Sequence, residues 1–496
     1  MRKLSAATAT ATATATVVGL VVGVIGLVGM PRPPRLPAAT TGDAELAAAV
    51  RDAAGDTEGL RGLSVALVEP GRVRVAGLGA RDTGGAPVEA DTAFEIGSVG
   101  KALTGMLLAD QVADGVVRPD DRLRDALPAV TGPAGEVTLA ELASHRSGLP
   151  RVPMPFPTGL AKVWWANLAA ADPYAGQDVD WLVRTASDTE PGDGRGEVRY
   201  SNFGAALLGQ ALAAKAGVSY PELLDRELLG PLGLSRTGFH LDGAALPAGH
   251  AEGSRAAGRP ADAWTGSGWA PAGIGLWSTA GDLGRLVTAL LAGAAPGADA
   301  TTPRFTEDDR NRVGYGWFTT RHGDREVVWH NGGTGGFRAY VGVDRAAGRG
   351  VVVLGNTDRR VDAIGLRLLD VPEEDLAGTD GVGLPGWVGV GLALALSLMG
   401  GWSLATVARR GPDRLTLVGT ALSAPVLLLL AYRLGEWTLA PGWVWALGCA
   451  ASAAALVAAA RRWPGLPLVA GVPPWRRWAG LTVEVVFVVL GLLVAF

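Results

Sequence analysis

Cysteine and lysine are scarce in this chain of 496 residues, which has one cysteine and four lysines. The lone cysteine, Cys449, excludes an intrachain disulfide and a cysteine-based metal site. Charged residues make up 19% of the chain and the formal net charge is -4. These values exclude a disordered chain and a basic nucleic-acid-binding protein. The 72 glycines follow no G-X-Y period, so they indicate many turns rather than collagen.

Apolar residues are in excess: 48% of the chain is hydrophobic and the mean hydropathy is +0.24. In a long chain this excess indicates membrane spans rather than a larger core. Arg2 and Lys3 precede an uncharged stretch, residues 4–30, which is the pattern of a signal peptide or a signal anchor. The stretch is long enough to cross a bilayer, and Pro31 follows it without a small-residue cleavage site. The pattern therefore favours an uncleaved anchor.

Four further apolar segments follow residue 384, and each is a candidate membrane span, with a buried core helix as the alternative. They are residues 385–408, 415–432, 437–460 and 478–496. If the N-terminus is inside, nine basic residues flank the spans on the inner side and only Arg433 lies in the short outer loop. We therefore expect the residues between 31 and about 384 to lie outside the cytoplasm. Glu484, inside the last segment, has either a functional role or a helix-packing role.

The outer residues have strand patterns at both ends. Residues 63–69 and 73–78 predict a hairpin near the start, and three segments after residue 325 predict a meander. The meander segments are 326–330, 337–344 and 350–354, followed by a helical pattern at 359–369. The middle predicts helices at 97–115, 139–144, 202–216 and 280–291. This order predicts one antiparallel sheet formed by both ends of the domain, a helical lobe inserted between them, and a cleft between the lobes.

Ser98 and Lys101 stand three residues apart at the predicted start of an apolar helix, so their side chains share one face. A helix N-terminus offers free N–H groups, and its dipole disfavours a second positive charge. The dipole and burial both lower the pKa of Lys101, which lets its amine take a proton from Ser98. The alternative is an N-cap serine beside a solvated lysine, which the dipole disfavours. Lys162 and Lys215 lack this setting and are predicted to be surface residues.

Two further motifs place polar residues at the ends of elements. Tyr200 and Asn202 stand two residues apart at the start of a predicted helix, and His330 ends a predicted strand. Gly332 and Gly333 follow His330 and let a substrate backbone approach closely. Each motif alone is weak, because Y-x-N occurs by chance and a glycine-rich strand end is usually a hairpin turn.

In this order and spacing, the motifs at 98–101, 200–202 and 330–333 resemble the three signature elements of the serine β-lactamase and penicillin-binding-protein superfamily. The resemblance is closest to its class C β-lactamase, D-aminopeptidase and esterase branch. Stretches that resemble recurring segments of that branch are 142–150, 230–235 and 275–283. The similarity covers about residues 45–370. It implies a β-lactamase-like fold of the α/β (α+β) class, with the antiparallel sheet and helical lobe described above.

The resemblance also implies roles for individual residues. Ser98 would be the acylated nucleophile, Lys101 its base partner, and Tyr200 the proton shuttle to the leaving group. Asn202 would bind the substrate amide. No cofactor is implied.

The third motif departs from the family pattern. His330 takes the place that a lysine holds in β-lactamases, and an imidazole is a poorer fixed anchor for a substrate carboxylate. His330 and Gly332 would line the substrate site, and the backbone N–H groups of Ser98 and Gly333 would form the oxyanion hole. His145 matches a recurring family position and is expected to be a hydrogen-bonded structural histidine. The remaining histidines show no ligand spacing, so no metal site is predicted.

The whole architecture resembles the membrane-bound prodrug-activating peptidases of nonribosomal peptide pathways, such as the colibactin-maturing peptidase. This resemblance implies a signal peptide or anchor (1–37), a serine hydrolase domain (38–375) and three transmembrane helices (376–496), one fewer than the hydropathy segments. It implies an acylated peptide or small-molecule substrate, a multi-pass location in the cytoplasmic membrane, and the lipid bilayer and an exporter as partners, with no nucleic acid. The reaction would remove an N-acyl-D-amino-acid leader from a peptide natural product precursor.

Two alternatives remain open at this point. A cell-envelope D,D-peptidase or an esterase would use the same residues on another substrate. A non-catalytic ligand sensor is the alternative from a different class. The intact serine, lysine and tyrosine argue against it, as do cytoplasmic loops too short to hold an output domain.

Overall fold

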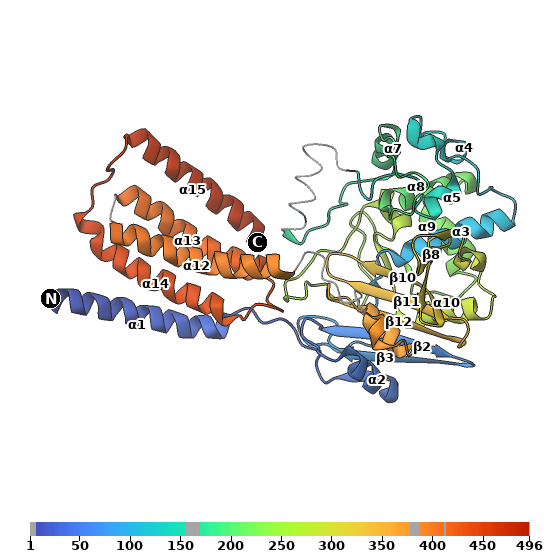
Figure 1. The fold of residues 1–496 in the computed structure, drawn as a ribbon, viewed down its shortest axis with the longest axis horizontal. Coiled ribbons are helices and arrows are strands. Elements are labelled where there is room, and N and C mark those ends of the chain that lie inside the picture. The colour runs from blue at the N-terminus through green and yellow to red at the C-terminus, as the bar shows by residue number, and fades with distance from the viewer. Residues whose placement is uncertain (1–5, 154–165, 167–168, 377–385, 411–412, 496) are drawn as a thin grey trace. The chain divides into compact units, whose positions relative to one another are not determined.

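The structure, a computed structural model of the whole chain, describes residues 6–153, 166, 169–376, 386–410 and 413–495 (Figure 1). The chain divides into two compact units. One comprises residues 34–256 and 260–381, and the other comprises residues 1–33, 257–259 and 382–496. Each unit is described by itself below.

The larger unit contains a nine-stranded antiparallel sheet with the order β1-β3-β2-β12-β11-β10-β9-β8-β7. Its strands are β1 (Thr40–Gly42), β2 (Gly62–Glu69), β3 (Arg72–Gly79), β7 (Phe305–Thr306), β8 (Asn311–Val313), β9 (Phe318–His322), β10 (Arg325–Gly333), β11 (Arg338–Asp344) and β12 (Arg349–Gly355). The early strand β2 pairs with the late strand β12, with Val65 opposite Val353. The prediction of one antiparallel sheet built from both ends of the domain is therefore confirmed.

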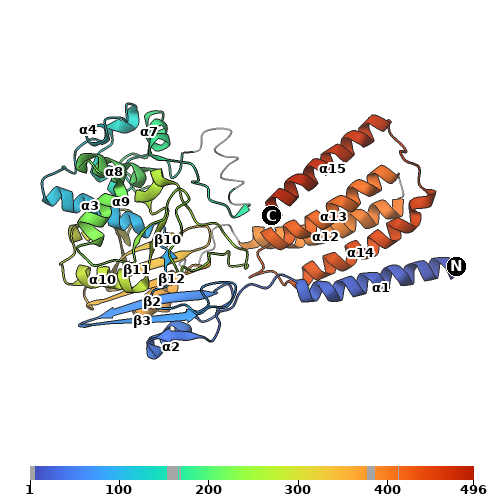
Figure 2. The same ribbon diagram turned by 180° about the vertical axis from the view of Figure 1, so that it is seen from behind.

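Helices cover both faces of this sheet (Figures 1 and 2), which explains why β2 is apolar on both sides. Val65 and Leu67 belong to one core with α2 (Ala44–Ala54) and α11 (Asp362–Leu368). Ala66 and Val68 point the other way, into the main core with α10 (Ala280–Leu291). Successive side chains of a strand point to opposite faces, so a strand covered on both sides carries an unbroken apolar run.

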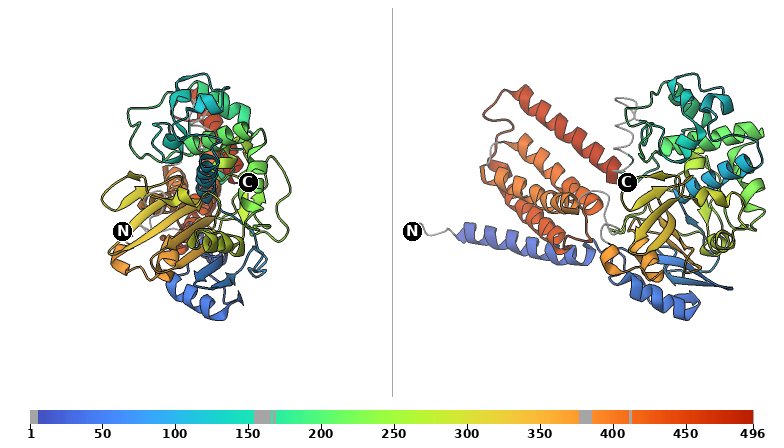
Figure 3. Two further views of the ribbon diagram at one scale, coloured as in Figure 1. Left: turned by 90° about the vertical axis from the view of Figure 1, so that its right-hand side faces the viewer. Right: turned by 45° about the vertical axis from the view of Figure 1, so that its right-hand side comes forward.

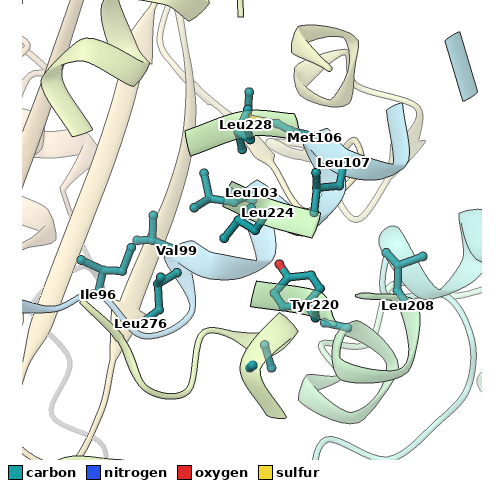
Figure 4. Close-up of a cluster of buried hydrophobic side chains, with 14 of the residues drawn as sticks. Ile96, Val99, Leu103, Met106, Leu107, Leu208, Tyr220, Leu224, Leu228 and Leu276 are labelled. Atoms are coloured by element: carbon teal, nitrogen blue, oxygen red, sulfur yellow. The ribbon is translucent and has the colours of Figure 1, made fainter. Parts of the chain in front are cut away.

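The helical lobe lies between the two groups of strands in the sequence. Its helices are α3 (Val99–Ala113), α4 (Leu123–Ala126), α5 (Leu139–Ala143), α7 (Val179–Ser187), α8 (Asn202–Ala216) and α9 (Tyr220–Leu224). Side chains of α3, including Leu103 and Met106, pack with Leu224 and Leu228 in its core (Figure 4). Because α8 is buried over almost its whole length, it is apolar around its full circumference.

Several short elements complete the larger unit. A second sheet has the order β4-β6-β5, with β4 at Phe94–Glu95, β5 at Gly238–Phe239 and β6 at Leu276–Ser278. Its 3₁₀ helices are Pro133–Glu136, Ser267–Ala272, Ala298–Thr301 and Glu373–Asp375, and a π-helical turn spans Asp225–Leu229. The sequence pattern missed this second sheet and strands β7 to β9, because each has five residues or fewer and several carry polar side chains.

The smaller unit contains five helices within the described residues, seen from a further angle in Figure 3. They are α1 (Ala6–Gly29), α12 (Gly386–Arg410), α13 (Arg414–Leu434), α14 (Trp443–Arg462) and α15 (Pro474–Ala495), with a 3₁₀ turn at Trp463–Gly465. Three segments are long and apolar enough to cross a membrane: Trp387–Arg410, Arg414–Leu434 and Trp443–Gly465. The fourth predicted segment lies in α15.

Helices α1 and α14 pack against each other through small residues. A Cβ atom on Gly23 would lie 3.1 Å from the Cβ of Ala450, and one on Gly26 would lie 3.1 Å from the Cα of Ala446. Such small-residue contacts let helix backbones approach closely in a membrane. Glu484 of α15 accepts a hydrogen bond of 2.6 Å from the Ser423 hydroxyl of α13, which is the contact expected for a helix-packing role.

Candidate active site

Ser98 and Lys101 meet at the start of α3. Ser98 occupies the N-cap position, but its hydroxyl makes no capping hydrogen bond. The Lys101 Nζ instead lies 2.7 Å from the Ser98 Oγ and donates to the Ala272 carbonyl at 2.8 Å. The lysine is only 2% exposed, so the alternative of a capping serine beside a solvated lysine does not describe the site.

Burial controls the charge of Lys101. Loss of solvent lowers the pKa of this amine well below its usual value, and the nearby positive charge of Arg151 lowers it further. A neutral amine beside a hydroxyl can accept its proton. The geometry thus provides a base in contact with the serine.

Tyr200 is the second residue beside the Ser98 hydroxyl. Its side chain hydrogen-bonds to Ser98, and its ring centre is 5.2 Å from the Lys101 Nζ. Burial raises the pKa of Tyr200 to about 12, against the opposing effects of the Ser98 hydrogen bond and the Arg151 charge. The phenol is therefore protonated at neutral pH and can act as a proton donor.

Asn202 begins α8, where Ser201 caps the helix by accepting a hydrogen bond from the Gly204 N–H at 2.9 Å. The Asn202 Nδ2 donates to the Tyr174 hydroxyl at 3.5 Å. Its Oδ1 is buried and has no hydrogen-bond partner among the described residues. A substrate N–H group is a suitable partner for this oxygen, since buried polar atoms are normally hydrogen-bonded.

His330 is a buried, neutral residue of β10. Its Nδ1 contacts the Asn331 carbonyl at 2.6 Å, and this contact requires the Nδ1–H tautomer. Its Nε2 is buried, carries the lone pair, and has no partner within the described part of the chain. Burial, followed by the charge of Lys101, lowers the pKa of His330 to about 3. The residue at this position therefore offers a hydrogen-bond acceptor rather than a positive charge.

The turn before Ser98 packs directly against the end of β10. Gly97 has a φ of 50°, and a Cβ atom on it would lie 2.9 Å from the Gly333 nitrogen. A Cβ atom on Gly332 would lie 1.9 Å from the Ile96 carbonyl oxygen. Only glycines permit this approach. It brings the backbone nitrogens of Ser98 and Gly333 into one neighbourhood, as an oxyanion hole requires.

Other residues complete the site, although the sequence patterns gave them no catalytic role. His145 is buried, its Nδ1 accepts a hydrogen bond from the Ser201 N–H at 3.3 Å, and its ring centre lies 4.5 Å from that of Tyr200. It is the expected hydrogen-bonded histidine, but it also supports the tyrosine. Arg151 is exposed, and its guanidinium lies 5.2 Å from the Tyr200 ring centre. In the sequence, only its position directly after the family-like stretch 142–150 points to a place near the active site.

The other two lysines between residues 31 and 384 were predicted to be surface residues. Lys215 is exposed near the C-terminal end of α8, as predicted for a surface residue. Lys162 lies outside the described residues.

Comparison with known proteins gives similarities to one family. The Beta-lactamase family matches residues 46–371, which is more than half of the chain. A β-lactamase of Pseudomonas fluorescens is 27% identical over 180 residues, covering 36% of this chain and 46% of that protein. Penicillin-binding protein 4 of Amycolatopsis lactamdurans is 29% identical over 157 residues, covering 31% and 38%. The D-alanyl-D-alanine-carboxypeptidase/endopeptidase AmpH of Escherichia coli (strain K12) is 29% identical, covering 30% and 37%.

The matched segments span less than half the length of these curated relatives. Solved structures match over nearly their whole length. A class C β-lactamase superposes with a TM-score of 0.56 at 20% identity, covering 66% of this chain and 97% of that chain. The class C β-lactamase from Rhodobacter sphaeroides gives 0.55 at 24% identity, covering 67% and 98%. These likenesses show the β-lactamase-like fold, and with the family match over residues 46–371 they establish that the chain belongs to the β-lactamase family.

Proposed function

We propose that this protein is a membrane-anchored serine hydrolase with its active site outside the cytoplasm. Its reaction would remove an N-acyl-D-amino-acid leader from the precursor of a peptide natural product. The hydrogen-bonded cluster of Ser98, Lys101 and Tyr200 supports the chemistry. Three helices long and apolar enough to cross a membrane support the anchoring.

The proposed reaction has two steps. In the first, the Ser98 Oγ attacks the amide carbonyl carbon while Lys101 takes the hydroxyl proton. The backbone N–H groups of Ser98 and Gly333 stabilise the negative charge on the carbonyl oxygen. Tyr200 passes a proton to the leaving nitrogen as the carbon–nitrogen bond breaks, and it regains a proton from the protonated Lys101. In the second step water attacks the acyl-enzyme, which releases the acid and restores the serine.

The neutral state of His330 is the observation that favours this class of substrate. A substrate with a carboxylate next to the scissile bond gains little from an imidazole whose pKa is about 3. An amide inside a longer molecule has no such carboxylate, and its polar groups can pair with the His330 Nε2 and the Asn202 Oδ1, which have no partner among the described residues. The site is therefore better suited to leader removal than to the release of a free C-terminal amino acid.

The alternative in the same chemical class is a cell-envelope D,D-peptidase or an esterase. The names of two relatives, penicillin-binding protein 4 and the carboxypeptidase/endopeptidase AmpH, favour the peptidase. The sensor alternative is disfavoured because a binding protein has no need of a lysine held neutral against a serine.

Membranes that contain the protein would be incubated separately with N-acyl-D-Asn amides, N-acyl-L-Asn amides and acyl-D-Ala-D-Ala. We expect release of acyl-D-Asn, and no release from membranes carrying Ser98→Ala. Exclusive release of D-Ala would contradict leader removal and favour the D,D-peptidase. A wild-type protein that neither cleaves a substrate nor reacts with a fluorophosphonate would contradict hydrolysis altogether.

A further inference from the structure

A buried carboxyl group lies three residues before the nucleophile. Glu95 belongs to β4, is 1% exposed and pairs through its backbone with Trp277 of β6. Burial raises the pKa of Glu95 to about 8, its two hydrogen bonds lower it, and the nearby acid Asp172 raises it. Burying a carboxyl group costs free energy unless the group is hydrogen-bonded. We therefore ask what the hydrogen bonds of Glu95 do for the active site.

Both oxygens of this carboxyl group are hydrogen-bonded to segments distant in the sequence. The Oε1 accepts from the Trp264 backbone N–H at 2.9 Å, and the Oε2 contacts the Thr334 hydroxyl, which donates at 2.8 Å. Thr334 directly follows Gly333 and is itself only 3% exposed. Glu95 thus connects the segment that leads to Ser98 with the turn that follows β10.

The contact between Glu95 and Trp264 extends toward the amide-binding side of the site. The Trp264 ring packs edge-on against Tyr174, with ring centres 5.2 Å apart. The Tyr174 hydroxyl is the group to which the Asn202 side chain donates. One carboxyl group therefore links the segments that carry the nucleophile, the oxyanion donor and the proposed amide-binding residue.

Glycine packing alone does not fix the separation of the two oxyanion donors. Gly97 and Gly333 approach each other closely, but glycines are also the residues whose backbone moves most freely. The pairing of Gly333 with Arg338 holds it to β11, whereas the contact between Glu95 and Thr334 directly joins the two segments that carry the donors. Preorganised donors are effective only when they already point to the position of the developing charge.

We propose that Glu95 is a positioning residue for the oxyanion hole: its carboxyl group, bonded to Thr334, holds the Gly333 N–H in register with the Ser98 N–H. This inference rests on the proposed serine chemistry. It assigns Glu95 no contact with the substrate.

The test compares Glu95→Ala, Glu95→Gln, Thr334→Val and the double variant Glu95→Ala/Thr334→Val with the wild type. The number of active sites is first titrated with a fluorophosphonate, so that loss of folded protein does not count as loss of rate. Hydrolysis of p-nitrophenyl butyrate per active site and inhibition by phenylboronic acid are then measured. Glu141→Ala is the matched control, because Glu141 also accepts several hydrogen bonds, from Arg195 and Thr138, in a purely structural setting.

We expect Glu95→Ala to lower kcat per active site by about 10-fold or more with little change in KM, since misplaced oxyanion donors act on the transition state. Phenylboronic acid, whose tetrahedral adduct occupies the oxyanion hole, should bind more weakly by a similar factor. Glu95→Gln should retain most of the rate, because an amide can donate to the Thr334 hydroxyl and accept from the Trp264 N–H. The double variant should be no worse than the poorer single variant.

An unchanged kcat per active site in Glu95→Ala would overturn this inference. Strictly additive losses in the double variant would overturn it as well, because they would separate Glu95 from Thr334. Glu141→Ala should change the yield of folded protein but not the rate per site. A wild type with no more labelling or hydrolysis than Ser98→Ala would instead overturn the proposed function, and this inference with it.

Discussion

Burial shifts the pKa values of the two groups beside the Ser98 hydroxyl in opposite directions. It lowers the pKa of Lys101, which favours the neutral amine, and raises the pKa of Tyr200 to about 12, which favours the neutral phenol. One group is left able to accept a proton and the other able to donate one. The same low-polarity surroundings lower the pKa of His330 to about 3, so its imidazole is uncharged at neutral pH.

Arg151 is the exposed positive charge next to this cluster, and its charge lowers the pKa of Lys101. Catalysis needs the neutral amine, so kcat/KM rises as the pH rises through the Lys101 pKa. Removing the charge by Arg151→Gln should raise that pKa and move the acidic limb of the pH profile to higher pH. The measurement is kcat/KM for a neutral ester between pH 4 and pH 9.

Arg118→Gln is the control for this prediction, because Arg118 is an exposed arginine that pairs with Asp120. It should leave the acidic limb in place. An Arg151→Gln profile that overlays that of the wild type would show that the acidic limb does not report Lys101.

Among the residues, sequence patterns located the signature positions but not their supports. Ser98 and Lys101 could be paired from local helix geometry, because they stand three residues apart. Glu95 and Thr334 could not, because their contact joins segments far apart in the chain. The same holds for the Ala272 carbonyl that anchors Lys101. Only the folded backbone brings such partners together.

Among the elements, prediction succeeded where periodicity extends over many residues. Helices 202–216 and 280–291 were predicted with the bounds that α8 and α10 have. The hairpin of β2 and β3 and the meander of β10 to β12 were predicted as well. Strands β7 and β8 have three residues or fewer, which is too short for an alternating pattern to be recognised.

The packing of α1 against α14 leads to a prediction for the N-terminal segment. A leucine at position 23 would clash with Ala450, whose Cβ is already close to the path of a Gly23 side chain. We expect Gly23→Leu to destabilise the detergent-solubilised protein by about 1–3 kcal/mol, as overpacking typically does. Thermal unfolding and N-terminal sequencing of the purified protein provide the measurement.

Gly29→Leu is the matched control, because a Cβ atom on Gly29 would meet nothing within 4 Å. If α1 is retained as an anchor, only Gly23→Leu lowers the unfolding temperature, and sequencing finds residues before Pro31. A mature protein that begins after residue 31, with no effect of Gly23→Leu, would identify the segment as a cleaved signal peptide.

At the scale of the whole molecule, the proposed function depends on which side of the membrane the hydrolase faces. The basic residues next to the spans predict that the larger unit lies outside and that Arg461 and Arg462 lie inside. Because Cys449 is the single cysteine, Cys449→Ala provides a cysteine-free background. In it, Lys215→Cys should react with a membrane-impermeant maleimide added to intact bacterial cells.

In the same background Arg461→Cys should react only after the membrane is opened. The reverse pattern of labelling would place the hydrolase in the cytoplasm and contradict the proposed role. Labelling of both positions in intact cells would show that the membranes were leaky, so a cytoplasmic marker enzyme must be assayed for release.

The most direct test of the central claim is covalent: mass spectrometry of the protein after reaction with a fluorophosphonate. We predict one adduct, on the peptide that contains Ser98, and no adduct in Ser98→Ala. Lys101→Ala should form the adduct at least about 100-fold more slowly, since it lacks the base. An adduct on another residue, or equal labelling of Ser98→Ala and the wild type, would contradict the assignment of Ser98 as the nucleophile.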